Sequence, residues 1–159
     1  NDDSYVTKVA LLLEDVDRDV RRAVAEALPR LADPGHGKAL QCLAYCVRSM
    51  LPFPKREDTR EAACWALAKF AERGNPAAIG TIRGTIDPDY PLATAGALRA
   101  LAELACSGDK VAIDAVALAL VHPEPRTRDL ATEVLAHLAD RGSAPPASAS
   151  ATTPFEGAW

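Results

Sequence analysis

With 159 residues, the chain is long enough for one domain that buries about 70% of the surface its unfolded form exposes. Hydrophobic residues make up 48% of the sequence and aromatic residues only 5%, so its apolar content is mainly alanine, leucine and valine, which favour closely packed helices. The net charge of −4 is spread along the chain, which argues against a nucleic-acid partner, and the longest apolar run, Val9 to Leu13, is far shorter than the ~20 residues of a membrane-spanning helix.

The chain begins at Asn1 without an initiator methionine or an apolar signal core. We therefore expect either that a leader has been removed or that the sequence was trimmed.

One segment recurs four times along the chain, each time ending at a glycine: Gly35, Gly74, Gly108 and Gly142. The glycines lie 39, 34 and 34 residues apart, which is typical of two-helix repeats. The five extra residues fall in the turn at 51–56. Eight helices are predicted, near residues 4–14, 18–33, 37–50, 57–73, 76–86, 91–106, 109–121 and 126–141.

Apolar residues recur at the same positions in every repeat. The second helices carry two such columns: Leu28, Leu67, Leu101 and Leu135, and three residues later Leu31, Phe70, Leu104 and Leu138. The first helices carry a comparable seam: Val6, Val9 and Leu13; Leu40, Leu43 and Val47; Ile79, Ile82 and Ile86; Ile113, Val116 and Leu120. This spacing predicts a buried helical face in each unit. We expect the closing glycine to cap each second helix in the left-handed conformation.

The first unit resembles a HEAT repeat, including the shorter bilin-lyase-like variant, over Leu12 to Leu28. It has an aspartate, Asp15, six residues before an arginine, Arg21. Arg60 and Arg128 keep the arginine position in units two and four, Thr94 replaces it in unit three, and Pro54, Pro88 and His122 replace the aspartate. The resemblance covers about residues 4–142. It implies an all-α, right-handed α-α superhelix, or solenoid, of about four hairpins, and a role as a scaffold, adaptor or enzyme accessory.

The sequence shows no grouping typical of catalysis or metal binding. His36, His122 and His137 are too scattered to form a metal-binding pair, so neither a metal nor another cofactor is expected. The four cysteines, Cys42, Cys46, Cys64 and Cys106, each lie among apolar neighbours in a predicted helix. They are interpreted as buried free thiols, which favours a reducing intracellular compartment, either the cytoplasm or an organelle interior.

Two outward columns of the second helices are the predicted binding face: Glu26, Trp65, Arg99 and Glu133, then Arg30, Lys69, Glu103 and His137. A third, preceding column contains Arg22, Glu61, Ala95 and Asp129. The first two are expected to be solvated, and the third gives a stripe of mixed charges, which is either part of a partner-binding face or simply a solvated one. Trp65 stands where the other units have glutamate or arginine, so the loop at 52–54 covers it or a partner does.

The composition changes after Gly142. Residues 1–142 are predicted to form the repeat domain, and residues 143–159 an extended tail rich in proline, alanine and serine. Its two large apolar residues, Phe155 and Trp159, are expected to anchor the tail in a groove of this solenoid or of a neighbouring subunit.

Together these features favour a non-catalytic scaffold or adaptor that binds protein partners, as a subunit of a larger assembly. The alternative is a substrate-holding accessory subunit of a modifying or chromophore-lyase-like enzyme. A deep polar pocket among the second helices would favour the accessory subunit, and a shallow groove would favour the scaffold.

Overall fold

The computed structural model describes residues 4–33, 36–48 and 55–143, and the part of the chain that it describes is helical. The α-helices are α1 (Ser4–Leu11), α2 (Arg18–Leu31), α3 (Gly37–Val47), α4 (Lys55–Phe70), α5 (Pro76–Arg83), α6 (Pro91–Leu104), α7 (Lys110–Leu118) and α8 (Pro125–Ser143). Two 3₁₀ turns, η1 (Leu12–Glu14) and η2 (Ala119–Val121), extend α1 and α7.

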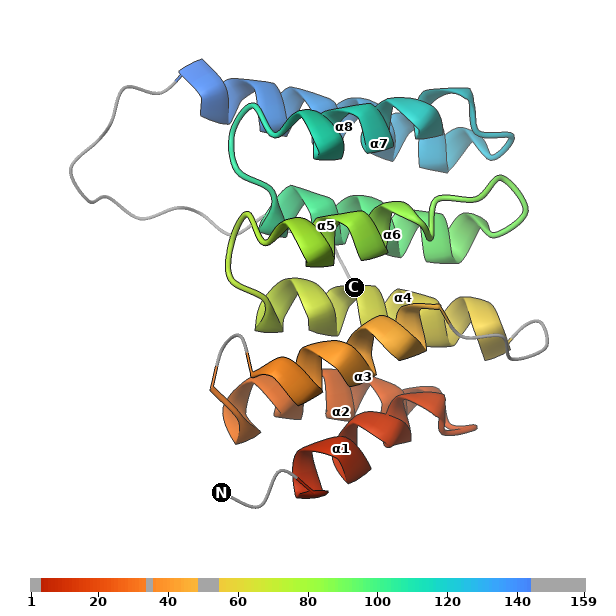
Figure 1. Cartoon of the computed structure of the whole chain (residues 1–159). Coiled ribbons are helices and arrows are strands. Elements are labelled where there is room, and N and C mark those ends of the chain that lie inside the picture. The colour runs from red at the N-terminus through yellow and green to blue at the C-terminus, as the bar shows by residue number, and fades with distance from the viewer. Residues whose placement is uncertain (1–3, 34–35, 49–54, 144–159) are drawn as a thin grey trace.

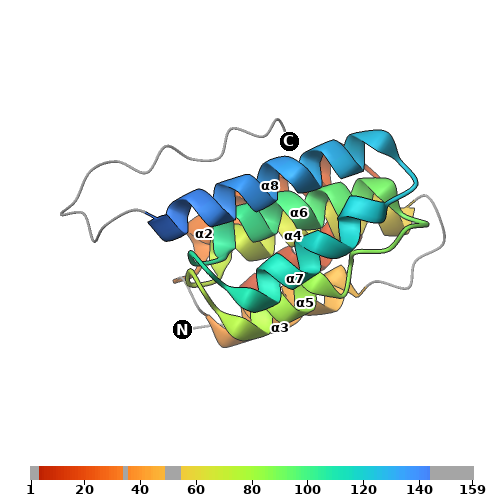
Figure 2. The same ribbon diagram turned by 90° about the horizontal axis from the view of Figure 1, so that it is seen from above.

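The helices form two layers in a stack of four hairpins (Figure 1). Seen from above, α2, α4, α6 and α8 lie in one layer and α3, α5 and α7 in the other (Figure 2). The most extensive contact is between the second helices α4 and α6, followed by α3 with α4 and α2 with α4. The predicted all-α solenoid is therefore confirmed.

The predicted leucine column forms the centre of the stack. Leu28, Leu67 and Leu101 are fully buried, and Leu135 in the last hairpin is half-buried. In the second column Phe70, Leu104 and Leu138 are buried, whereas Leu31 in the first hairpin is exposed. Alanines fill most of the space between these residues, and their small side chains let neighbouring helices approach closely.

Side chains at the helix starts explain where several helices begin. The Asp17 carboxylate accepts a hydrogen bond from the Asp19 amide at 2.8 Å, and Asn75 and Asp109 cap α5 and α7 in the same way. Proline occupies the first turn of α5 and α6, where its missing amide donor costs nothing.

The glycines do not cap the second helices as predicted. α4 ends at Phe70 and α6 at Leu104, several residues before Gly74 and Gly108. Both glycines do have positive φ angles, +80° and +72°, but in the turns that lead to the next hairpin. α8 continues through Gly142 to Ser143, and Gly35 lies outside the described residues. The Gly74 amide donates to the Leu104 carbonyl oxygen at 2.8 Å, so this turn links two units.

The column of Arg21 ties the internal turn to the second helix in the first, third and fourth hairpins. Arg21 Nη1 donates to the carbonyl oxygens of Asp15 at 2.7 Å and Val16 at 3.2 Å. Arg128 repeats this arrangement with the carbonyls of His122 and Pro123, at 2.7 and 2.8 Å. In the third unit Thr94 takes the place of the arginine, and its hydroxyl binds the backbone amide and carbonyl of Asp87 in the turn.

Polar bonds also join successive hairpins. The buried Glu57 carboxylate on α4 accepts hydrogen bonds from the Leu92 and Ala93 amides, at the N-terminus of α6. Between the third and fourth units, His122 Nε2 lies 3.4 Å from the Asp87 carbonyl oxygen, while its Nδ1 accepts from the Glu124 amide. Nδ1 therefore carries no proton, and Nε2 is the donor to Asp87.

Candidate protein-binding site

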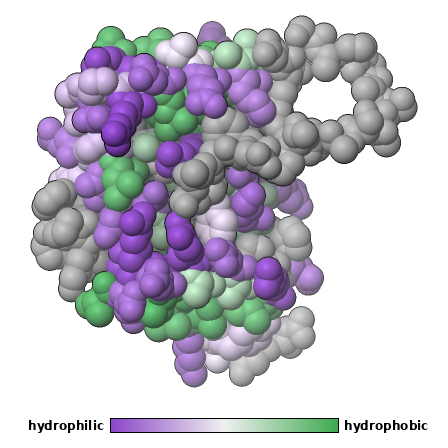
Figure 3. Space-filling view, turned by 180° about the vertical axis from the view of Figure 1, so that it is seen from behind, coloured by the Kyte–Doolittle hydropathy of each residue, from purple (hydrophilic) through white to green (hydrophobic). Residues whose placement is uncertain are grey.

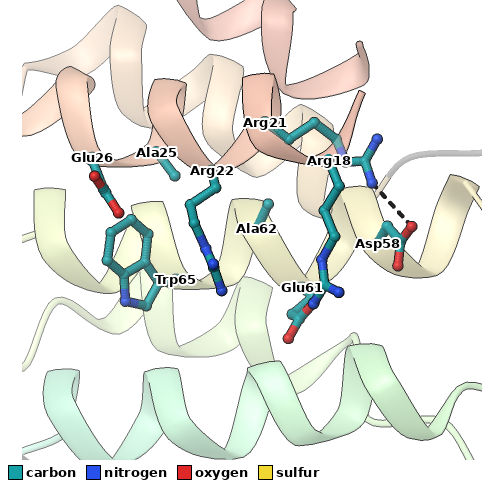
Figure 4. Close-up of a pocket in the computed structure, with 9 residues that line it drawn as sticks. All are labelled: Arg18, Arg21, Arg22, Ala25, Glu26, Asp58, Glu61, Ala62 and Trp65. Atoms are coloured by element: carbon teal, nitrogen blue, oxygen red, sulfur yellow. Dashed lines mark hydrogen bonds and ion pairs between the residues drawn. The ribbon is translucent and has the colours of Figure 1, made fainter. Parts of the chain in front are cut away.

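A groove between α2 and α4 lies beside the predicted binding face (Figure 4). It is open to solvent, and its cavity volume is only about 50 Å³. Its lining residues are Arg18, Arg21, Arg22, Ala25, Glu26, Asp58, Glu61, Ala62 and Trp65. The groove is thus a shallow cleft and not a deep enclosed pocket.

The floor of the groove is apolar. Ala25 on α2 and Ala62 on α4 carry only a methyl group each, which leaves room beside the Trp65 indole. Trp65 is half-buried and packs against the core, so the prediction that its column is solvated is wrong at this position. Part of its cover comes from α2, because the indole lies beside Glu26 (Figure 4). The loop at 52–54 lies outside the described residues.

Charged side chains surround this floor. Arg21 Nη2 lies 2.9 Å from Asp58 Oδ2, and Arg18 Nη2 lies 3.5 Å from Glu61 Oε2. Both pairs join α2 to α4 across the groove. Arg22 and Glu26 are exposed at the rim. The three arginines and three carboxylates balance, so the site offers paired charges on an apolar floor.

Glu61 is the least expected member of the site. Its column was predicted to form a stripe of mixed charges on the outward face, yet Glu61 is buried. Burial raises the pKa of its carboxyl above the ordinary value of 4.5, and the nearby guanidinium groups of Arg18, Arg99 and Arg22 oppose this rise. Its burial follows from the close approach of α6: a Cβ at Gly96 would lie 2.9 Å from Glu61 Cγ.

We expect the stability of the Glu61→Gln variant, relative to that of the wild type, to increase as the pH rises. An acid whose pKa is raised by folding stabilises the protein fully below its unfolded pKa, near 4.5, and this contribution is lost as the pH rises through the higher folded value. Glutamine suffers no such loss. We would measure the denaturation midpoints of the wild type and the variant at pH 4 and at pH 7. The midpoint of the variant, relative to that of the wild type, should be higher at pH 7 than at pH 4. Glu26→Gln, at the exposed rim, is the control and should show no such shift; a shift toward the wild type for Glu61→Gln would contradict the argument.

The structure separates the other candidate residues. Lys69 Nζ lies 2.6 Å from Glu103 Oε2, so these two form an ion pair between α4 and α6. Arg99 is half-buried near Glu61. Arg30 is exposed at the end of α2; Glu133 is exposed and His137 half-buried, both on α8, two units from the groove. Phe155 and Trp159 lie outside the described residues.

The sequence prediction therefore located Glu26 and Trp65 in the groove but missed Arg18, Arg21, Asp58 and the burial of Glu61. One signal was available for Glu61. Gly96 interrupts a predicted helix at a position where the units before it have alanine, and a glycine inside a helix often marks a close backbone approach.

The cysteines differ from one another. Cys46 and Cys64 are buried, and burial raises the pKa of each thiol to about 12. Both are therefore protonated and unreactive at neutral pH. Cys42 is half-buried. The prediction for Cys106 is wrong, because α6 ends before it and its side chain is exposed in the following turn.

Among the described residues, no three histidine, cysteine or acidic side chains are grouped so that they could hold a metal ion. Within the same residues, each helix is too short or too polar to cross a membrane.

Comparison with known proteins gives one match. A family model described as HEAT repeats matches residues 6–102, which extend from α1 almost to the end of α6. No curated protein and no solved structure matches the chain.

Proposed function

The chain belongs to the HEAT repeat family, and on this premise we propose that it is a non-catalytic scaffold or adaptor that binds a protein partner at the α2–α4 groove. HEAT repeats generally mediate protein–protein interaction. The observation that carries the proposal is the partly exposed Trp65 indole beside an alanine floor, surrounded by charges.

The form of the groove supports a scaffold over an enzyme accessory that holds a substrate. A site for a modified side chain needs convergent polar groups in an enclosed space. Here the space is open, and Arg18 and Arg21 already form ion pairs with Glu61 and Asp58. An open apolar floor with a tryptophan at its edge suits one or two apolar side chains of a partner segment.

The rim suggests the charge of the contacting segment. Arg22 and Glu26 are one helical turn apart on α2, and both are exposed. A partner that places an acidic residue over Arg22, a basic residue over Glu26 and an apolar residue over Trp65 gains from all three contacts. Because the rim is exposed, the charges set specificity and association rate more than affinity.

We expect Arg22→Glu to weaken partner binding by about tenfold, because the reversed charge repels the partner's acidic residue. Folding should change little, because the Arg22 side chain is exposed. Trp65→Ala should weaken binding by at least as much, and because the indole is half-buried it should also cost about 1–2 kcal/mol of stability. The measurement is quantitative mass spectrometry of proteins co-purified with each variant from the native source, followed by titration of the enriched partner.

Arg126→Glu is the matched control, since Arg126 is also an exposed arginine, on α8, far from the groove. A partner that is lost with Arg22→Glu and Trp65→Ala but kept with Arg126→Glu supports the proposal. Equal binding by all three variants would show that partners bind elsewhere.

A further inference from the structure

The tail that follows α8 has two parts of different composition. Residues 144–154 contain only alanine, proline, serine and threonine, a composition typical of an extended spacer. Phe155 and Glu156 come directly after this spacer, and Glu156 is the only charged residue in 144–159. The sequence thus places an aromatic and an acidic side chain next to each other, behind a spacer that has neither.

The α2–α4 groove offers a contact for each of these two side chains. Trp65 is partly exposed beside the alanine floor, where a second aromatic ring can pack against the indole. Arg22 is exposed at the rim, whereas the two other arginines of the groove form the ion pairs that cross it. The Arg22 side chain lies next to Trp65, so one short segment can contact both (Figure 4).

The groove also lies within reach of the tail. α8 ends at Ser143, ten residues beyond Glu133, which occupies the repeat position of Trp65. Ten helical residues are about 15 Å long, and the two helix spacings from α8 to α4 are about 20 Å, so Ser143 lies about 25 Å from Trp65. The twelve residues from Ser143 to Phe155 span about 40 Å when extended. The spacer is therefore long enough.

Other surfaces match Phe155 and Glu156 less well. A groove along α5 is lined by Arg48 and Arg60, but none of its described lining residues is aromatic. A hollow between α1 and α3 contains Tyr45, but no charged residue is among the described ones that line it. Figure 3 looks onto the second-helix layer, to which α4 and α8 belong; polar and charged side chains there surround smaller hydrophobic areas. Of these three sites, only the α2–α4 groove combines an aromatic residue with an exposed arginine.

We propose that Phe155 and Glu156 bind the α2–α4 groove of their own chain, with the phenyl ring against the Trp65 indole and the carboxylate beside Arg22. The proposal rests on the proposed function, because it makes the tail the occupant of that site when no partner is bound. Neighbouring side chains of an extended segment point in different directions, so one covers the floor while the next reaches the rim. With a volume of about 50 Å³ the cavity does not enclose a ring, so the phenyl group lies across the floor.

The covalent link makes a weak contact sufficient. One aromatic contact and one exposed ion pair correspond to a Kd of about 1 mM for a free peptide. A short flexible linker gives the attached segment an effective concentration in the millimolar range, so about half of the molecules or more have the tail in the groove. A partner that also contacts Glu26 displaces the tail, which has no basic residue to place there. The tail thus lowers the apparent affinity of the partner.

The test measures how well acrylamide, an uncharged quencher, reaches Trp65 in the full chain. Trp159→Phe serves as the background, because it leaves Trp65 as the only tryptophan and keeps an aromatic ring at residue 159. In this background Phe155→Ala should raise the quenching constant about twofold, because it empties the groove. Arg22→Glu should raise it as well, and Arg22→Glu combined with Glu156→Arg should restore the lower value.

Arg48→Glu is the matched control, since it reverses an exposed arginine that lines the α5 groove and should leave the quenching constant unchanged. The constant should also be the same at about 1 and about 100 μM protein, because a segment of the same chain is not diluted. Three results would overturn the proposal: no change with Phe155→Ala, no restoration by the charge exchange, or an increase with Arg48→Glu. Protection that grows with protein concentration would also overturn it, because the tail would then bind a second copy.

These measurements need no partner, so they separate this proposal from the function proposed for the groove. If the partner binds at the groove, Phe155→Ala should raise the partner's affinity about two- to tenfold, because the tail no longer competes. If Phe155→Ala exposes Trp65 but leaves the partner's affinity unchanged, the tail binds the groove and the partner binds elsewhere. If Phe155→Ala leaves Trp65 quenching unchanged while Trp65→Ala and Arg22→Glu still lose the partner, only the tail proposal fails.

Discussion

Replacement of Arg21 by alanine should lower the free energy of unfolding by about 3–4 kcal/mol, because it removes the buried member of an ion pair that also holds two backbone carbonyls. Arg21 is only 2% exposed, and its guanidinium group binds three acceptors: the carbonyls of Asp15 and Val16, and the Asp58 carboxylate. Alanine leaves all three without their donor and opens a space between the first two hairpins. The cost of such orphaned groups exceeds the net worth of the bonds themselves.

Urea denaturation followed by circular dichroism measures this loss directly. Arg22→Ala is the control, since Arg22 is the adjacent arginine on α2 and is exposed; its effect should stay within about 0.5 kcal/mol. Arg128→Ala removes the equivalent bonds in the fourth hairpin, where the arginine is half-buried, and should cost about 1–2 kcal/mol. If Arg21→Ala proved as mild as Arg22→Ala, the arginine would not be what holds the first turn.

The repeat position occupied by Arg21 shows what a repeat motif in a sequence does and does not specify. Asp15 and Arg21 are six residues apart, and this spacing identified the repeat, yet their carboxylate and guanidinium groups do not pair. Asp15 Oδ1 accepts the Asp17 amide and shapes the turn, while Arg21 binds the backbone of that turn. Thr94 performs the second task in the third unit with a hydroxyl group. The position of a polar residue was predictable, but the atoms that it binds were not.

The fold could be predicted because it depends on local periodicity. Leu28, Leu67 and Leu101 recur at helical spacing within a regular repeat, and such a column has few alternatives to burial. Helix ends were harder, because glycine permits a positive φ angle several residues away from the last helical turn as readily as at the cap. Gly74 lies in such a turn and binds the next unit through its amide.

The binding site could be predicted only in part, because its geometry depends on how neighbouring hairpins approach. Trp65 and Glu26 were recognised from their unusual residue types at an outward position. Glu57 and Glu61 were not, since a glutamate in a helix is ordinarily solvated, and only the proximity of α6 makes both of them buried. Such contacts between units leave little trace in the sequence of either one.

Gly96 is the residue that sets this proximity, and its replacement by valine should destabilise the protein by about 2–4 kcal/mol. A Cβ at residue 96 would lie 2.9 Å from Glu61 Cγ and 3.0 Å from Glu61 Cα. The first atom can move, but the second belongs to the α4 backbone, so α4 and α6 would have to separate. This is the most extensive helix contact in the stack, and overpacking a contact of this kind outweighs the small gain in helix propensity.

Gly80→Ala provides the matched comparison, because Gly80 lies in α5 with no atom within 4 Å of a Cβ at that position. There the helix propensity of alanine acts alone and should stabilise the protein by up to about 1 kcal/mol. The two glycine substitutions should therefore shift the urea midpoint in opposite directions. Because Gly96 lies against Glu61, its valine variant should also disturb the groove and weaken partner binding, whereas Gly80→Ala should not. A stable Gly96→Val protein with normal binding would show that α4 and α6 are not held at the distance on which the site depends.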